Sequence, residues 1–191
     1  MTRLGPRLRH GLGVAAAVVA LDQLSKWLLP HWLVADPVGW TACTPVPPLE
    51  VTGFFNLVLY CNRGVSFSML HTQSAAGPWV LSLGALLIVA GLLVWLGRTR
   101  RLWPAVALGL IIGGALGNVV DRLRLGAVVD FLDLHGWGYH WPAFNLADSA
   151  ITVGVILLVI DGLFTRGEGS KMRGAGGGPR PIGENSKTRS S

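Results

Sequence analysis

The sequence predicts an all-α integral membrane protein with four transmembrane helices and a small β-containing outer-face subdomain in the first extracytoplasmic loop. Composition supports this class, because 51% of the 191 residues are hydrophobic and 14% are charged. Soluble domains carry about 25% charged residues. Four apolar stretches each reach the roughly 20 residues that a helix needs to cross a bilayer. We therefore expect one membrane domain over residues 1–165.

The four expected helices cover about residues 11–34, 79–97, 102–120 and 144–164. Arg3, Arg7 and Arg9 precede the first apolar run, as basic residues do in a cleaved signal peptide. The run continues well past the length of a signal peptide core, and no small-residue cleavage site follows it. We expect this segment to be retained as the first helix.

The third stretch carries Gly109, Gly113 and Gly117 at four-residue intervals. Small residues at this spacing form a groove on one helix face, which lets a neighbouring helix approach closely. The pattern predicts a tight helix contact along this stretch.

Basic residues in short flanks predict the orientation. They lie before the first helix, in the turn Arg98-Thr99-Arg100-Arg101, and after the fourth helix from Arg166. In a four-helix topology all three flanks fall on one side of the membrane. We expect both termini in the cytoplasm of a bacterium and residues 35–78 and 121–143 on the outer face.

The first outer segment has a strand-like stretch from Leu49 to Tyr60, rich in β-branched and aromatic residues, with turn signals around Asn62-Arg63-Gly64. The pattern predicts a short strand or hairpin. Cys43 and Cys61 both lie on this side. Two cysteines alone leave a disulfide and two free thiols open.

The net charge of +6 is concentrated at the C-terminus, where residues 166–191 hold six basic and two acidic residues. The rest of the chain has no basic stripe interleaved with aromatics, so we expect no nucleic-acid binding. The segment 166–191, rich in Gly, Pro and Ser, is interpreted as a disordered basic cytoplasmic tail near anionic lipid.

Charged groups inside membrane spans need an explanation, since their burial in lipid is costly. Asp22 and Lys26 are four residues apart, hence on one helix face, where they can pair. Asn118, Asp121 and Arg122 share a face at the outer end of the third helix. The simplest interpretation of Asp121 beside Arg122 is a structural pair that ties the helix end to the loop.

Asp130 in the second outer segment and Asp148 at the start of the fourth helix are both expected near the outer membrane surface. Two carboxylates that share one proton can hydrolyse a peptide bond without a metal, because one accepts a proton from water while the other donates one. The alternative is that Asp148 caps the helix and that Asp130 is a solvated loop residue.

A metal site is conceivable from the acidic and histidine side chains of the second outer segment, namely Asp130, Asp133, His135, His140 and Asp148. No regular element obviously aligns His135 with His140, so we expect neither a metal nor a cofactor. The aromatic residues Trp137, Tyr139 and Trp141 are interpreted as an interfacial anchor.

Five blocks spread over residues 18–161 occur together in this chain. They read Asp22-Gln23-x-Ser25-Lys26, Asn62-Arg63-Gly64-Val65-Ser66-Phe67-Ser68, Gly113-Gly114-Ala115-Leu116-Gly117-Asn118-Val119-Val120-Asp121-Arg122, Val128-Val129-Asp130-Phe131 and Trp141-Pro142-Ala143-Phe144-Asn145-Leu146-Ala147-Asp148-Ser149-Ala150. In content and order they resemble the blocks of the bacterial lipoprotein signal peptidases, also called signal peptidase II.

The resemblance implies a membrane aspartic endopeptidase that cleaves diacylglyceryl-modified prolipoproteins just before the lipidated cysteine. It implies that Asp130 and Asp148 form the catalytic pair. Asn62, Asn118, Arg122 and Asn145 would then shape the polar pocket, and Asp22, Lys26 and Asp121 would hold the fold. We expect a monomer with the active site at the outer face of the cytoplasmic membrane.

Two other classes compete with this interpretation. A small transporter or proton carrier would use Asp22, Lys26 and Asp148 as a relay, but it predicts acidic residues spread across the depth of the bilayer. A non-catalytic scaffold leaves the polar blocks unexplained.

Overall fold

The computed structural model describes residues 5–33, 43, 46–64 and 76–174. Four helices and four strands follow one another in the order α1, β1, β2, α2, α3, β3, β4 and α4. Block residues 65–68 and the tail beyond residue 174 lie outside this part of the chain.

The helices are α1 (Pro6–Leu33), α2 (Gly77–Arg98), α3 (Leu102–Leu125) and α4 (Leu146–Gly174). Each contains a segment long and apolar enough to cross a membrane. These segments agree with the four expected spans, although α3 ends five residues later than expected. In α4 the apolar part ends at Phe164, while the helix continues to Gly174. The expectation of disorder from residue 166 is therefore wrong for residues 166–174.

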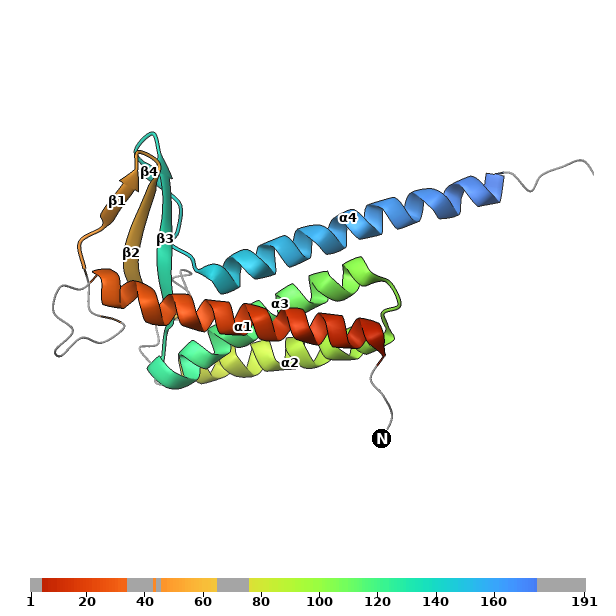
Figure 1. The fold of residues 1–191 in the computed structure, drawn as a ribbon, viewed down its shortest axis with the longest axis horizontal. Coiled ribbons are helices and arrows are strands. Elements are labelled where there is room, and N and C mark those ends of the chain that lie inside the picture. The colour runs from red at the N-terminus through yellow and green to blue at the C-terminus, as the bar shows by residue number, and fades with distance from the viewer. Residues whose placement is uncertain (1–4, 34–42, 44–45, 65–75, 175–191) are drawn as a thin grey trace, which may run out of the picture.

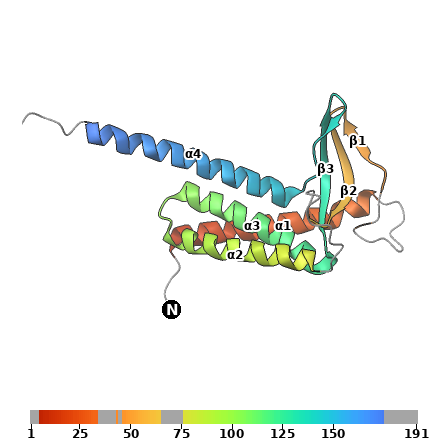
Figure 2. The ribbon, with the colours of Figure 1, turned by 180° about the vertical axis from the view of Figure 1, so that it is seen from behind.

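Helix α3 is the central helix, since 67% of its most apolar window is buried, against 17% to 22% for the other three. It contacts α1, α2 and α4. Figures 1 and 2 show α1, α2 and α3 side by side, whereas α4 diverges from them toward its C-terminal end. The exposed faces of α2 and α4 are lined by large apolar side chains, as expected for surfaces in contact with lipid.

The glycine stripe of α3 makes the predicted close contact, and its partner is α1. A Cβ atom added at Gly113 would lie 2.7 Å from the backbone oxygen of Ala15, and one at Gly109 would collide with the backbone of Gly11. Gly114, on the adjacent face, lies equally close to Ala147 of α4. The absence of a side chain at these glycines thus allows the backbone of α3 to pack directly against the backbones of α1 and α4.

The strands are β1 (Leu49–Thr52), β2 (Phe55–Asn62), β3 (Val128–Gly136) and β4 (Tyr139–His140). They form one antiparallel sheet in that order. The predicted hairpin in the first outer segment is confirmed. The second outer segment, for which no strand was predicted, supplies β3 and β4 of the same sheet.

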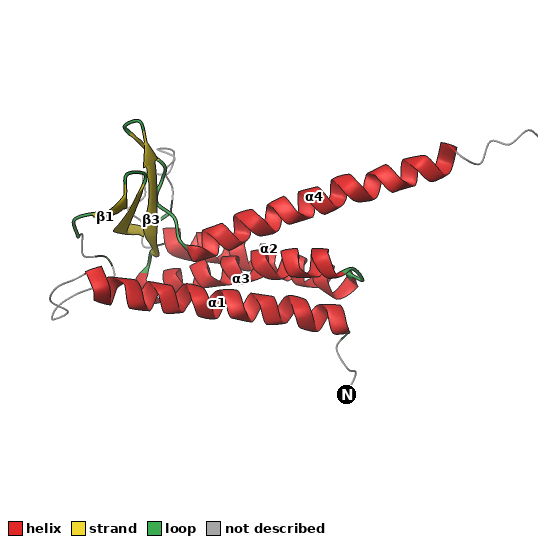
Figure 3. Ribbon diagram, turned by 45° about the horizontal axis from the view of Figure 1, so that its top comes forward, coloured by secondary structure: helices red, strands yellow, loops and turns green. Residues whose placement is uncertain are grey.

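The sheet stands at one end of the helices, next to the C-terminal end of α1 and the N-terminal end of α4 (Figures 1 and 3). The N-terminal end of α1 and the C-terminal end of α4 lie at the opposite end. Cys43 and Cys61 form a disulfide within the first outer segment, which ties position 43 to β2. The protein therefore has a helical body with a sheet at only one end.

Candidate active site

Asp130 lies in β3, at the junction of the sheet and the helices, and its side chain is 3% exposed. Both of its oxygens accept hydrogen bonds from side-chain amides. Asn145 donates to Oδ1 at 2.7 Å, and Asn62 of β2 donates to Oδ2 at 3.2 Å. The interpretation of Asp130 as a solvated loop residue is wrong, because it is a buried and fully partnered strand residue.

Asp148 lies in the first turn of α4, and Asn145 caps this helix. Asn145 Oδ1 accepts the backbone N–H of Asp148 at 3.0 Å, and the carboxylate of Asp148 accepts the backbone N–H of Asn145 at 3.3 Å. This reciprocal pair is a capping box, which satisfies two helix N–H groups at once. One oxygen of Asp148 therefore has a structural role, and the cap residue itself is Asn145.

The two carboxylates are connected through two amides. Asn118 of α3 donates to Asp148 Oδ1 at 2.8 Å, and its own Oδ1 lies 3.2 Å from the amide nitrogen of Asn145. That nitrogen also donates to Asp130. A continuous path of hydrogen bonds thus joins Asp130 and Asp148, so the positions of the two carboxylates depend on each other.

Burial and, to a smaller extent, the nearby charge of Asp148 raise the pKa of Asp130 to about 6. The hydrogen bonds from Asn62 and Asn145 act against this rise, since they stabilise the ionised form. A carboxyl group with such a pKa can hold a proton near neutral pH.

Arg122 supplies the positive charge of the site. Its guanidinium interacts electrostatically with Asp148, Asp121 and Asp130. Nη1 donates weakly to the backbone oxygen of Asn118 at 3.4 Å. Within the described residues, its buried Nε has no hydrogen-bond partner.

Lys26 links two buried acidic residues of the helices. Its Nζ lies 2.8 Å from Asp22 Oδ2, 2.8 Å from Asp121 Oδ2 and 3.2 Å from Asn118 Oδ1. All four residues are buried. The predicted Asp22–Lys26 pair is confirmed. Asp121 forms its direct ion pair with Lys26 rather than with Arg122, which interacts with Asp121 only electrostatically among the described residues.

The two carboxylates paired with Lys26 also accept hydrogen bonds from backbone N–H groups next to the catalytic candidates. Asp22 Oδ1 accepts the N–H of Ala147 at 3.0 Å, one residue before Asp148. Asp121 Oδ2 accepts the N–H of Val129 at 3.1 Å, one residue before Asp130. The buried network therefore fixes the two backbone segments that carry Asp130 and Asp148.

A β-bulge in β2 decides which asparagine faces Asp130. Between the pairs Leu57–Leu132 and Tyr60–Asp130, β2 has one residue more than β3. Such an extra residue shifts the alternation of side chains by one position. As a result Asn62 reaches Asp130, while Asn56 donates to Asp133 at 3.0 Å. Residues 130 and 133 lie on opposite faces of β3, since they are three positions apart and side chains alternate along a strand.

Sequence reasoning assigned no role to Gln23. Its amide nitrogen donates to Asp121 Oδ1 at 2.8 Å and to the backbone oxygen of Gly117 at 3.2 Å. It therefore joins α1 to α3 beside the Lys26 network. A polar side chain within an apolar span was the available signal, because such groups in membrane helices usually have a partner inside the protein.

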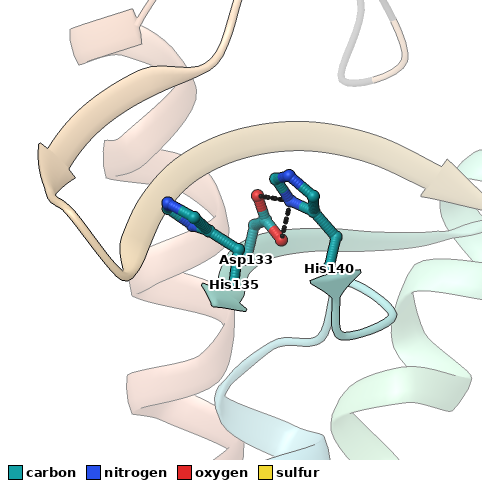
Figure 4. Close-up of side chains that lie close together, drawn as sticks. All are labelled: Asp133, His135 and His140. Atoms are coloured by element: carbon teal, nitrogen blue, oxygen red, sulfur yellow. Dashed lines mark hydrogen bonds and ion pairs between the residues drawn. The ribbon is translucent and has the colours of Figure 1, made fainter. Parts of the chain in front are cut away.

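The two histidines of the second outer segment, His135 and His140, are brought side by side by strand pairing. His135 of β3 pairs directly with His140 of β4, and both lie near Asp133 (Figure 4). The argument that no regular element brings them together is wrong, because β4 is only two residues long and gave no strand pattern. Asp133 is not part of the hydrogen-bond path that joins Asp130 and Asp148.

The sequence was compared with known proteins. The family described as Signal peptidase (SPase) II matches residues 14–164. A lipoprotein signal peptidase of Rhizorhabdus wittichii is 45% identical over 157 residues, which cover 82% of this chain and 87% of that protein. A lipoprotein signal peptidase of Burkholderia vietnamiensis is 46% identical over 155 residues, covering 80% and 86%.

Two solved structures, both described as bacterial membrane enzymes studied by the in meso method, have a similar fold. The one at 2.3 Å has a TM-score of 0.64 and 30% identity, and the match covers 80% of this chain and 87% of that chain. The one at 1.9 Å has the same TM-score and identity, with coverage of 79% and 90%.

Proposed function

The chain belongs to the signal peptidase II family, and from this premise we propose that it cleaves diacylglyceryl-modified prolipoproteins just before the lipidated cysteine, with Asp130 and Asp148 as its catalytic pair. The family makes it a peptidase of prolipoprotein signal peptides in a bacterial membrane. The transporter alternative is not favoured, because the relatives are peptidases and its supposed relay residues are held in a fixed network.

The observation that carries the aspartic mechanism is the connected pair of carboxylates. Asp130 is buried beside Asp148 and has a pKa raised to about 6. We assign the shared proton to Asp130 and the charge to Asp148. Asp148 then removes a proton from water, whose oxygen attacks the scissile carbonyl carbon. Asp130 donates its proton to the carbonyl oxygen.

The second half of the reaction restores the pair. When the tetrahedral intermediate collapses, the carbon–nitrogen bond breaks and Asp148 gives its proton to the departing amine. The hydroxyl proton of the intermediate returns to Asp130 as the carboxyl product forms. Neither carboxylate is changed over the cycle, which is the requirement for a pair of general acid and base.

The asparagines and Arg122 support this chemistry by position. Asn62 and Asn145 hold both oxygens of Asp130, and Asn118 holds Asp148. The unpartnered Nε of Arg122 supplies a donor for a substrate carbonyl near the acidic pair. We propose that these four side chains line the substrate pocket.

The location of the pair suits a lipid-anchored substrate. It lies where the sheet meets the helix ends, and the basic flanks lie at the opposite end of the bundle (Figure 1). Arg7 donates to the backbone oxygen of Arg100, and Arg101 pairs with Asp161. If the basic end is cytoplasmic, the site is at the outer surface, where a bilayer-spanning signal helix presents its C-terminal end.

The decisive experiment is cleavage by the purified chain in detergent. A prolipoprotein with a diacylglyceryl cysteine should give two products, and mass spectrometry should place the cut on the N-terminal side of that cysteine. Cleavage at another bond, or no cleavage by folded protein, would contradict the proposal.

A further inference from the structure

The β3–β4 hairpin brings three potential metal ligands to one face. Asp133 and His135 are two residues apart in β3, so both side chains point to the same side of the sheet. His140 of β4 is the direct cross-strand partner of His135, and cross-strand partners share a face. Figure 4 shows the three side chains gathered there.

The hairpin is closed by a two-residue turn, Trp137-Gly138. Both residues have positive φ values, 50° and 79°, as in the type I′ turn that matches the twist of paired strands. A tryptophan is strained in this conformation. The tight turn fixes the pairing of His135 with His140 and therefore the shape of the cluster.

The distances suit a single cation. One ligand atom from each of the three side chains lies within 4.8 Å of the others. His140 Nδ1 is 2.9 Å and 3.1 Å from the two oxygens of Asp133, and the two imidazole rings are stacked with centroids 4.9 Å apart. Ligands of a tetrahedral zinc ion lie roughly 3.3 Å from one another. Small side-chain rotations, available to the exposed His140, close the remaining gap.

Three buried side-chain polar atoms lack a hydrogen-bond partner among the described residues, and two of them belong to this cluster or its support. These two are Nδ1 of His135 and Oδ1 of Asn56. Asn56 is 5% exposed, and its Nδ2 donates to Asp133 Oδ2 at 3.0 Å. A buried polar atom without a hydrogen bond costs stability. A cation would satisfy the imidazole nitrogen, and a water bound to it would satisfy the amide oxygen.

We propose that Asp133, His135 and His140 bind one Zn²⁺ ion, or a similar divalent transition-metal ion, on the face of the sheet opposite to Asp130. Two imidazole nitrogens and one carboxylate oxygen form a donor set that zinc prefers, with a water as the fourth ligand. Asn56 orients the carboxylate through its hydrogen bond, as residues behind metal ligands commonly do. The exposed side of His140 gives the ion a path from solvent.

This site is separate from the catalytic pair. Asp133 and Asp130 lie on opposite faces of β3, so the ion stands behind the strand that carries Asp130. The chain between Asp130 and Asp148 passes through the hairpin and returns along β3, where Phe144 pairs with Leu132. A bound ion would join β3 to β4 and stabilise this return path without taking part in proton transfer.

Metal titration of the full chain in detergent tests the proposal. After removal of metal with a chelator, Co²⁺ is added and its visible absorption is followed, with Zn²⁺ as competitor. The wild type should bind one equivalent of Co²⁺, which one equivalent of Zn²⁺ displaces. His135→Gln and His140→Gln should each weaken binding by at least about tenfold. His10→Gln, an exposed histidine of α1, is the matched control and should bind as the wild type does.

The apparent unfolding temperature gives a second measurement. Zinc should raise the apparent unfolding temperature of the wild type and of His10→Gln, but not that of His140→Gln. The side chain of His140 is exposed, so its replacement leaves the packed interior unchanged. No saturable absorption change in the wild type would overturn the proposal. Unchanged Co²⁺ affinity in His140→Gln, or an equal loss in His10→Gln, would overturn it as well.

Discussion

The side-chain amide of Asn145 donates to Asp130 at 2.7 Å, and Asn145 at the same time caps the helix whose first turn carries Asp148. One residue therefore sets the position of both carboxylates. The predictions below follow from this arrangement and from the buried network behind it.

Replacing either carboxylate should abolish cleavage. Asn has nearly the shape of Asp but can neither hold a shared proton nor carry the charge, so Asp130→Asn and Asp148→Asn should each lose more than about 1,000-fold in single-turnover rate. The double variant should be little worse, because residues that act as one unit are not additive. Asp161→Asn, at the far end of α4, is the control. Substantial turnover by a folded single variant would contradict the assignment.

The rate should depend on the proton of Asp130. Since its pKa is raised to about 6, kcat/KM should fall as the pH rises through that value, because the proton donor is lost. The measured pKa belongs to the pair rather than to one residue. A profile that keeps rising above pH 7 would contradict the assignment of the proton to Asp130.

The free energy of unfolding should also depend on pH through the proton of Asp130. The folded-state pKa of Asp130, about 6, lies well above the usual aspartate value of 3.8, so the folded protein holds the proton more tightly than the unfolded chain. The wild type should therefore lose up to about 3 kcal/mol as the pH rises from about 4 to 6. Asp130→Asn lacks this loss. Apparent unfolding temperatures of the two proteins, measured against pH in detergent, should diverge over that window.

Lys26→Met should unfold the protein or greatly weaken it. The change leaves Asp22 and Asp121 buried without their cation, which costs about 3–5 kcal/mol. Arg101→Met removes a cation from the more exposed Arg101–Asp161 pair and should cost less than about 1 kcal/mol. Thermal unfolding in detergent compares the two variants. Equal effects would mean that the buried network does not hold the site.

Reporter fusions test the orientation. Because the basic flanks lie at one end of the helices, fusions after Gly97 and Gly169 should report a cytoplasmic location, and a fusion near Gly77 an external one. An external signal from the Gly169 fusion would rule out the arrangement of four spans with both termini inside.

The lipid on the substrate should matter. A site at the end of the helices, beside lipid-facing surfaces, should accept a substrate whose acyl chains remain in the bilayer. Unlipidated prolipoprotein should be cleaved at least about tenfold more slowly in kcat/KM, since it loses the binding energy of the chains. Equal rates on both substrates would argue against the proposed specificity.

The four spans could be predicted from the sequence because hydropathy over about 20 residues is a strong signal. The glycine stripe likewise predicted a close helix contact, although it could not identify α1 as the partner. Strands β3 and β4 were not predicted. Val128–Gly136 mixes buried and exposed positions without clear alternation, and two residues are too few for a pattern.

Pairings within the site were harder to predict than its members. Spacing along one helix identified Asp22 with Lys26, because residues four apart are neighbours. The partner of Asp121 lies on another helix, and the nearby Arg122 suggested the wrong pair. The contacts of Asn56 and Asn62 depend on the register of two strands from distant segments, which local sequence does not encode.

The extra residue in β2 has a consequence for how the outer sheet tolerates change in length. Deleting either Val58 or Leu59 would restore strict alternation, so that positions 56 and 62 would fall on the same side. One of the two asparagines would then lose its aspartate, whichever face the strand presented. Removing or adding two residues at a time would keep the side chains at positions 56 and 62 on their present, opposite faces of the sheet. Length variation in this strand should therefore occur in even steps, unless a compensating change occurs in β3.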